Sequence, residues 1–123
     1  MLNMSFVTNS SSVSYLVALA PDEAMEYFYK LYRRLLEAGH RVDELFLVPV
    51  TLDARGLQYV MDYADWTPYE EYAARAKRLF QQAIANDKHV YEVTVPAGPV
   101  AEEALGNEGD LQVDSDVIFI SGP

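Results

Sequence analysis

Four serines near the start of the sequence could, by type and spacing, support nucleophilic chemistry or anion binding. They lie in the segment T-N-S-S-S-V-S, residues 8–14. A serine nucleophile needs a general base within hydrogen-bond reach, but the two histidines, His40 and His89, lie in no recognisable catalytic motif. A phosphate-binding loop uses glycines to let backbone amides approach, and no glycine precedes Gly39. The four serines are Ser10, Ser11, Ser12 and Ser14.

The same polar segment also has a structural interpretation. Thr8, Asn9 and the serines can satisfy their own backbone groups through local side-chain hydrogen bonds, as in a turn or an adaptable arm. A hairpin that returns from Phe6 and Val7 along residues 15–19 would use the same residues. Since catalytic machinery is missing, we expect this arm to make contacts with a protein. The candidate contact residues are Asn9, Ser10, Ser11 and Ser12.

A second candidate is the aromatic segment of residues 59–72, which holds four tyrosines, four acids and the single tryptophan. Tyrosine and tryptophan dominate binding hot spots, so a loop containing Tyr63, Asp65 and Trp66 could form an interface. The alternative is burial. Tyr69 and Tyr72 can join the core face of a helix, and Trp66 can pack on the first helical turns as a hydrophobic staple.

The last third of the chain is acidic without compensating cations. Lys88 is the last basic residue, and residues 89–123 carry seven acids. One end of the molecule is therefore expected to be negative, either as a solvated face or as a docking surface for a basic partner. The candidates for such a surface are Glu102, Glu103, Asp110, Asp114 and Asp116.

Three of these acids, in the segment 110–116, could in principle gather a hard cation such as calcium or magnesium through oxygen ligands. The segment lacks the glycine and the distal glutamate of the helix-loop-helix calcium site, which favours a solvated turn. His40 and His89 have no partner at metal-ligand spacing, and we interpret both as surface residues. We therefore predict no metal and no other cofactor.

Composition narrows the classes of protein further. A chain of 123 residues has the size of one domain, and the absence of cysteine excludes disulfides, thiolate metal sites and cysteine nucleophiles. A net charge of −10 disfavours direct binding to nucleic acid, which needs a cationic footprint. No segment has the length of a membrane helix or the pattern of a secretion signal. We expect a soluble protein in the cytoplasm.

The first half of the chain predicts a strand, a long helix and a second strand. Residues 15–19 have strand length, and Pro21 with two acids suits a helix start, with Gly39 placed to end the helix. Residues 45–52 are almost continuously apolar, as in a strand covered on both faces, but Pro49 requires an end or an edge. In the helix, two neighbouring stripes predict a wide buried face. They are Ala24, Phe28, Leu31, Leu35 and Ala38, and Met25, Tyr29, Tyr32 and Leu36.

The second half predicts two helices and two strands. Asp53 can cap a short helix that contains Gly56, and Thr67 with Pro68 signals the start of a long helix that ends near Asn86. Residues 89–95 alternate as a strand does, residues 100–105 can form one or two helical turns, and residues 116–121 form a buried last strand.

These elements predict an α+β fold, or a small α/β fold, in the order β-α-β-α-α-β-β. We expect a mixed sheet of about four strands, because helices that join strands favour parallel pairs and a later strand can return antiparallel. Two long helices would cover one face of this sheet. Residues 1–14 would form the serine-rich arm or turn, and residues 15–123 a single globular domain.

The segment F-V-T-N-S-S-S-V-S-Y, Phe6 to Tyr15, resembles the opening of a set of small, mostly uncharacterised bacterial and bacteriophage proteins. Those proteins begin with a phenylalanine, T-N-S-S-S, another serine and an aromatic residue, and this chain departs from them by placing Val13 within the serine run. The resemblance implies a phage or mobile-element origin, and with it a location in the cytoplasm of a bacterial host cell or in a virion. It also makes Met4 an equivalent start.

We therefore expect a small acidic protein that acts by protein–protein interaction or self-association, most concretely as a phage virion or assembly component. The rival hypothesis is an acidic inhibitor that occupies a basic site on a host protein, and its binding would weaken steeply with salt. A third hypothesis is an enzyme that uses serine or carboxylates.

Overall fold

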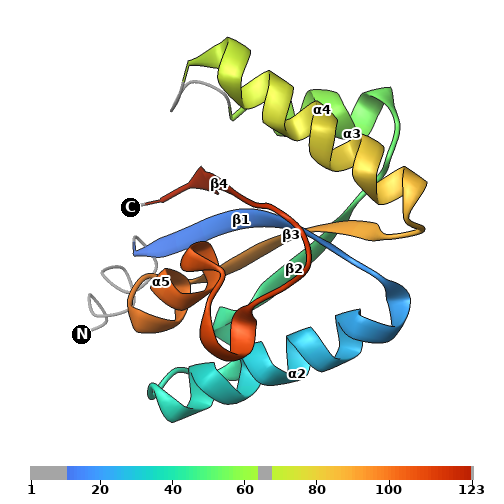
Figure 1. Ribbon diagram of the computed structural model, residues 1–123. Coiled ribbons are helices and arrows are strands. Elements are labelled where there is room, and N and C mark those ends of the chain that lie inside the picture. Colours follow the sequence, from blue (N-terminus) through green and yellow to red (C-terminus); the bar gives the residue numbers. More distant parts are fainter. Residues whose placement is uncertain (1–10, 64–67, 123) are drawn as a thin grey trace.

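The computed structural model describes residues 11–63 and 68–122, which form an α+β fold with a four-stranded antiparallel sheet (Figure 1). Two of its helices are long, as predicted, with 17 residues each. The elements in chain order are β1 Ser12–Leu19, α2 Pro21–Glu37, η1 Val42–Glu44, β2 Phe46–Val50, α3 Ala54–Met61, α4 Tyr69–Ala85, β3 His89–Pro96, α5 Pro99–Gly106, η3 Gly109–Leu111 and β4 Val117–Ser121.

The strands lie in the order β2-β3-β1-β4, and every neighbouring pair is antiparallel. The prediction of a mixed sheet is therefore wrong. Helix α2 does join two strands of the same direction, but β3 lies between them, and β1 separates β3 from β4 in the same way. This interleaving of two β-α-β units is the arrangement of ferredoxin-like folds.

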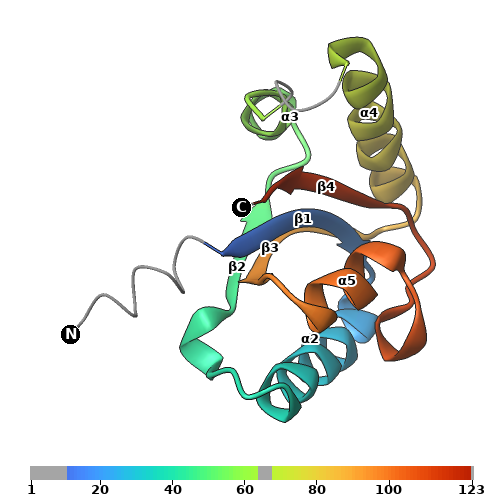
Figure 2. The same ribbon diagram turned by 90° about the vertical axis from the view of Figure 1, so that its left-hand side faces the viewer.

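Helices cover both faces of the sheet, so the expectation of helices on one face is also wrong. Helices α2 and α5 lie on one face, and α3 and α4 lie on the other (Figures 1 and 2). The second layer comes from the α3–α4 segment, which is inserted between β2 and β3. The predicted order also lacked one helix, α5, which forms where one or two helical turns were expected at residues 100–105.

Strand β1 supplies both cores because its side chains alternate between the two faces. Tyr15, Val17 and Leu19 face α2, whereas Leu16 and Ala18 face the α3–α4 layer. Its edges are also occupied, by β3 on one side and β4 on the other. Phe6 and Val7, the other half of the predicted hairpin, lie outside the described residues. The strand begins at Ser12, so residues 12–14 belong to the domain rather than to the predicted arm.

Helix α2 begins and ends as predicted, but it buries only one of its two apolar stripes. The side chain of Glu23 accepts a hydrogen bond from the Ala20 amide at 2.7 Å, and Gly39 has a positive φ of 89° just after the helix. The buried residues are Ala24, Tyr27, Leu31 and Leu35. The second stripe stays outside the core because the sheet contacts only one side of the cylinder, so the prediction of a wide buried face is wrong.

Helices α3 and α4 follow their predicted boundaries closely. Asp53 caps α3 and accepts a hydrogen bond from the Gly56 amide at 2.9 Å. Helix α4 begins at Tyr69, and Thr67, its predicted cap, lies outside the described residues. Tyr72 is buried as expected, whereas Tyr69 is exposed and does not join the core.

A pair of buried hydroxyl groups joins β1 to α2. The hydroxyls of Tyr15 and Tyr27 lie 2.8 Å apart and form a hydrogen bond inside the core. Burial is the main cause of the raised pKa of both phenols, and it brings the pKa of Tyr27 to about 12. Both hydroxyls therefore stay protonated in the folded protein at pH values where an unfolded tyrosine ionises.

We predict that Gly56→Ala destabilises the protein by about 2 kcal/mol or more, because the added Cβ would overlap the carbonyl oxygen of Thr51. Urea denaturation followed by circular dichroism measures the change. The matched control is Gly106→Ala, where the nearest atom would lie at 3.4 Å in the side chain of Glu108. A small or stabilising effect is expected there, and equal losses at both glycines would contradict the packing argument.

We also predict that stability falls as pH rises above about 10. A folded-state pKa raised above the unfolded value stabilises the protein below the unfolded pKa, and this stabilisation is lost as pH rises toward the folded pKa. Each buried tyrosine of the Tyr15–Tyr27 pair should lower the free energy of unfolding by about 1.4 kcal/mol per pH unit in this window. Denaturation curves between pH 8 and about pH 12 should show a shallower decline in Tyr27→Phe, and equal slopes would contradict the assignment.

Candidate interaction surface

The described part of the serine-rich segment has structural roles. The carbonyl of Ser11 accepts a hydrogen bond from the Ala97 amide at 2.8 Å, and Ser12 opens β1. The hydroxyl of Ser14 lies 2.7 Å from the hydroxyl of Thr94, its cross-strand neighbour in β3. Among the described residues, no hydrogen bond joins a serine to a histidine. Four of the predicted contact residues lie outside the described residues: Asn9, Ser10, Asp65 and Trp66.

The acids of the last third meet cations that come from earlier in the chain. Arg34 lies 2.6 Å from Glu103 and 4.0 Å from Asp110, and Arg75 lies 3.0 Å from Asp116. The order of charges along the sequence did not indicate these ion pairs, because both arginines precede Lys88. Glu102 and Asp114 have no ion pair within the described ranges. The predicted negative surface is therefore partly neutralised.

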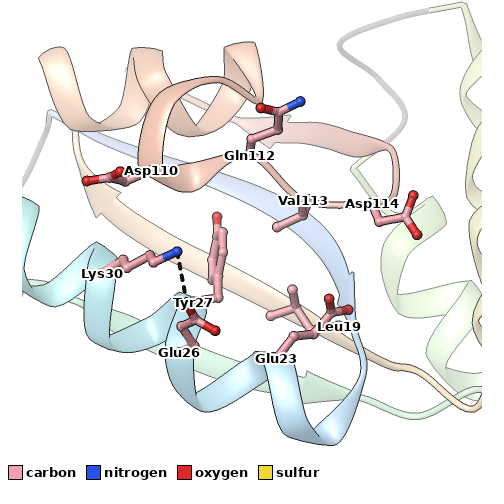
Figure 3. Close-up of a pocket in the computed structure, with 9 residues that line it drawn as sticks. All are labelled: Leu19, Glu23, Glu26, Tyr27, Lys30, Asp110, Gln112, Val113 and Asp114. Atoms are coloured by element: carbon pink, nitrogen blue, oxygen red, sulfur yellow. Dashed lines mark ion pairs between the residues drawn. The ribbon is translucent and has the colours of Figure 1, made fainter.

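A recess of about 420 Å³ lies between α2 and residues 110–114 (Figure 3). Its rim carries acids from both sides, but cations are also present: Lys30 lies 3.1 Å from Glu26, and Lys88 lies 3.8 Å from Glu23. In the parts of the chain that are described, no group of three or more histidine or carboxylate side chains could hold a metal ion. The recess is thus a mixed-charge surface.

Exposed apolar side chains are concentrated elsewhere, in the part of the molecule formed by α2, η1 and β2. Of ten large apolar side chains that are exposed among the described residues, seven belong to residues 25–48. Met25 is 81% exposed, Tyr29 58% and Phe46 59%. We call this area the α2–β2 surface. Its exposed members are Met25, Tyr29, Leu36, Val42, Phe46, Leu47 and Val48.

Two aromatic rings connect the helical and strand parts of the α2–β2 surface. Phe28, which lies beside the exposed stripe of α2, packs edge-on against Tyr91 of β3, with ring centroids 5.0 Å apart. Tyr91 in turn is the cross-strand neighbour of Pro49 in β2. Apolar side chains therefore continue from the exposed stripe of α2, under the sheet, to its outer strand.

The other face of β2 is apolar as well. Phe46 and Val48 point to this face, and a groove of about 370 Å³ runs between β2 and α3. Its lining is Val48, Pro49, Val50, Thr51, Arg55, Gly56 and Tyr59. Strand β2 is thus a ridge with apolar side chains on both sides. The prediction that it is covered on both faces is wrong, whereas the prediction of an edge strand is confirmed.

A buried carboxylate lies behind this groove. Glu92 of β3 is only 7% exposed and accepts a hydrogen bond of 2.5 Å from the hydroxyl of Tyr59. That hydrogen bond is the main cause of the raised pKa of the Tyr59 phenol. Tyr63 packs edge-on against Tyr59, with ring centroids 5.8 Å apart. The pair holds α3 on the sheet and thereby fixes the wall of the groove.

Sequence reasoning missed both the α2–β2 surface and the Glu92 pair. The signal for the first was present, because Met25, Tyr29, Tyr32 and Leu36 form a stripe of their own about 120° from the centre of the buried stripe. The signal for the second was a single acid in an otherwise uncharged strand core, residues 90–95. Neither pattern identifies the group that these side chains contact.

Comparisons with known proteins identify no relative: no family model, no curated protein and no solved structure matches the chain. Within residues 11–63 and 68–122, no helix has the length and apolar character needed to cross a membrane.

We predict that Tyr59→Phe lowers the free energy of unfolding by about 1–3 kcal/mol at neutral pH, because Glu92 loses the hydrogen-bond donor that offsets its burial. Thermal and urea denaturation measure the loss. Tyr69→Phe is the matched control, since Tyr69 is exposed on α4. If the two variants are equally stable, the Tyr59–Glu92 hydrogen bond does not contribute as proposed.

Proposed function

We propose that this protein is a non-enzymatic interaction protein that binds a protein partner through the α2–β2 surface. The observation that carries the proposal is the concentration of exposed apolar side chains in residues 25–48. Contiguous exposed apolar patches larger than a few hundred Å² are rare on monomers and usually mark a binding site. Aromatic residues and methionine, which are enriched in interfaces, are well represented there.

A comparison within the sheet supports a specific role for β2. Strands β2 and β4 are both edge strands of five residues. In β4 the side chains of Ile118 and Ile120 are almost completely buried, whereas in β2 only Val50 is buried. Exposure of β2 is therefore not a general consequence of its position at an edge.

The border of the α2 stripe also has the character of an interface. Arg33 lies 3.7 Å from Glu37 and 5.9 Å from the centre of the Tyr29 ring. An apolar centre with a polar rim is the usual composition of a protein–protein contact.

The alternative of an acidic inhibitor receives less support. The contacts of Arg34 and Arg75 with Glu103, Asp110 and Asp116 neutralise part of the charge that such a protein would present to a basic site. A serine- or carboxylate-dependent enzyme is less favoured still, because Ser14 and Glu92 both have structural hydrogen-bond partners.

A virion or assembly component is the most concrete form of the proposed function. Such a protein needs a stable core and a complementary surface but no catalytic residues, and the chain provides the first two. The resemblance of residues 6–15 to bacteriophage proteins supports the same choice.

We predict that a photo-crosslinking amino acid at position 29 or 46 captures a protein partner in the bacterial cell that produces the protein. The control position is Ile84, which is 58% exposed on α4, away from the α2–β2 surface. Adducts should form at positions 29 and 46 and be at least about tenfold weaker at position 84. Adducts of equal strength at all three positions, or adducts at none, would contradict the proposed surface, and mass spectrometry identifies the captured protein.

A further inference from the structure

We infer that the partner on the α2–β2 surface is a second copy of this chain, joined edge to edge through β2 about a two-fold axis. The inference rests on the proposed function and gives it a specific partner.

The outer edge of β2 is open to strand pairing. Among residues 11–63 and 68–122, only β3 lies beside β2, and the sequence of the strand, F-L-V-P-V, contains no charged side chain. Proteins that must stay monomeric usually protect such an edge with charges or cover it with another element. Here the neighbouring side chains of Phe46, Leu47 and Val48 are exposed instead.

Pro49 selects the register of the pairing. Successive residues of a strand direct their amides to opposite edges, and Pro49 has no amide hydrogen to give to β3. If Leu47 and Pro49 direct their backbone groups away from β3, the missing amide hydrogen of Pro49 removes no hydrogen bond between β2 and β3. A two-fold axis at Leu47 then pairs residues 45–49 of both copies and uses the carbonyl of Pro49 as an acceptor. An axis at Val48 would place the missing amides next to the axis and form fewer hydrogen bonds.

This register matches apolar side chains across the axis. Phe46 lies opposite Val48 of the second copy as a non-hydrogen-bonded pair, in which side chains approach closely. Both residues point to the face of α3, so the two grooves beside β2 become continuous. Leu47 meets its own equivalent on the opposite face.

The exposed stripe of α2 lies on the side of the molecule that the second copy would cover. Phe28 contacts Tyr91 in β3, the strand next to β2, and Phe28 is three residues after Met25 and four before Tyr32. The stripe therefore borders Phe28 on the side of α2 nearer to β2. Edge-to-edge pairing brings the two α2 stripes together below the joined sheets. One partner thus covers both parts of the α2–β2 surface.

Charge favours an antiparallel arrangement. Arg41 and Asp43 lie before β2, and Asp53 and Arg55 follow it, so each end of the strand carries both signs. With the axis at Leu47, Arg41 of one copy approaches Asp53 of the other. The uncompensated acids Glu102 and Asp114 lie in α5 and in the segment before β4, which is the opposite edge strand.

The exposed area is of the size that a dimer needs. A standard interface buries roughly 800 Å² on each partner, and a single aromatic side chain supplies about 150–250 Å² when fully buried. Seven large apolar side chains, each about 40–80% exposed, approach this area before any backbone is counted.

Disulfide trapping tests the pairing and its register, because the natural chain contains no cysteine. The variants Phe46→Cys and Val48→Cys are mixed and oxidised under mild conditions. In the inferred register only the mixed pair places the two sulfurs at a suitable distance, so the mixture should form disulfide dimers at least about tenfold faster than either variant alone. Ile84→Cys, exposed on α4, should behave like the single variants. Equal rates in all samples would overturn the inferred pairing.

Sedimentation equilibrium of the unmodified chain provides a second measurement. We expect a dimer that strengthens as salt is raised from low to moderate concentration, because screening reduces repulsion between two copies of net charge −10. Leu47→Lys should raise the dissociation constant by about 10- to 100-fold, whereas Ile84→Lys should leave it unchanged.

A monomer at about 100 µM would overturn the inference. If the photo-crosslinkers at positions 29 and 46 then capture a different protein, the α2–β2 surface is still a binding site and only the identity of the partner is wrong. If they capture nothing, the proposed function fails as well.

Discussion

The structure depends on the central position of β1. This strand pairs with β3 along eight residues and with β4 on its other edge, and its side chains enter both hydrophobic cores. A residue that is fully removed from water stabilises the fold by about 1.5–3 kcal/mol, and Tyr15, Leu16, Val17 and Leu19 are all at this limit. Because β1 is closed on every side, new contacts can form only at the periphery of the sheet.

The sequence was a good guide to local structure and a poor guide to the sheet. Capping by Asp53, the stop at Gly39 and the proline start of α2 are short-range effects, and the structure contains each of them. The order of strands depends on contacts between residues far apart in the chain, such as Ser12 with Pro96. A helix between two strands indicates that they run in the same direction, but it does not indicate that a third strand separates them.

Contacts between residues far apart in the chain also explain why the sequence overstated the negative charge of the last third. The run of acids after Lys88 is real, but its partners Arg34 and Arg75 lie on α2 and α4 and reach the acids only through the fold. The Glu92 pair has the same origin, since Tyr59 is 33 residues away in sequence. The stripe of α2 is the opposite case, because its spacing was visible in the sequence. It was assigned to the core because an amphipathic pattern does not state which of two neighbouring stripes faces the sheet.

In the proposed function, the two edges of the sheet have different roles, one in folding and the other in binding. Strand β4 buries its isoleucines and completes the core, and the adjoining segments carry the acids that keep the surface negative. Strand β2 contributes one buried valine and leaves the rest of its apolar side chains in water. Their transfer free energy, about 25 cal/mol per Å² of apolar area, is therefore still available after folding. A surface that does little for the stability of the monomer while exposing this much apolar area is best explained by association.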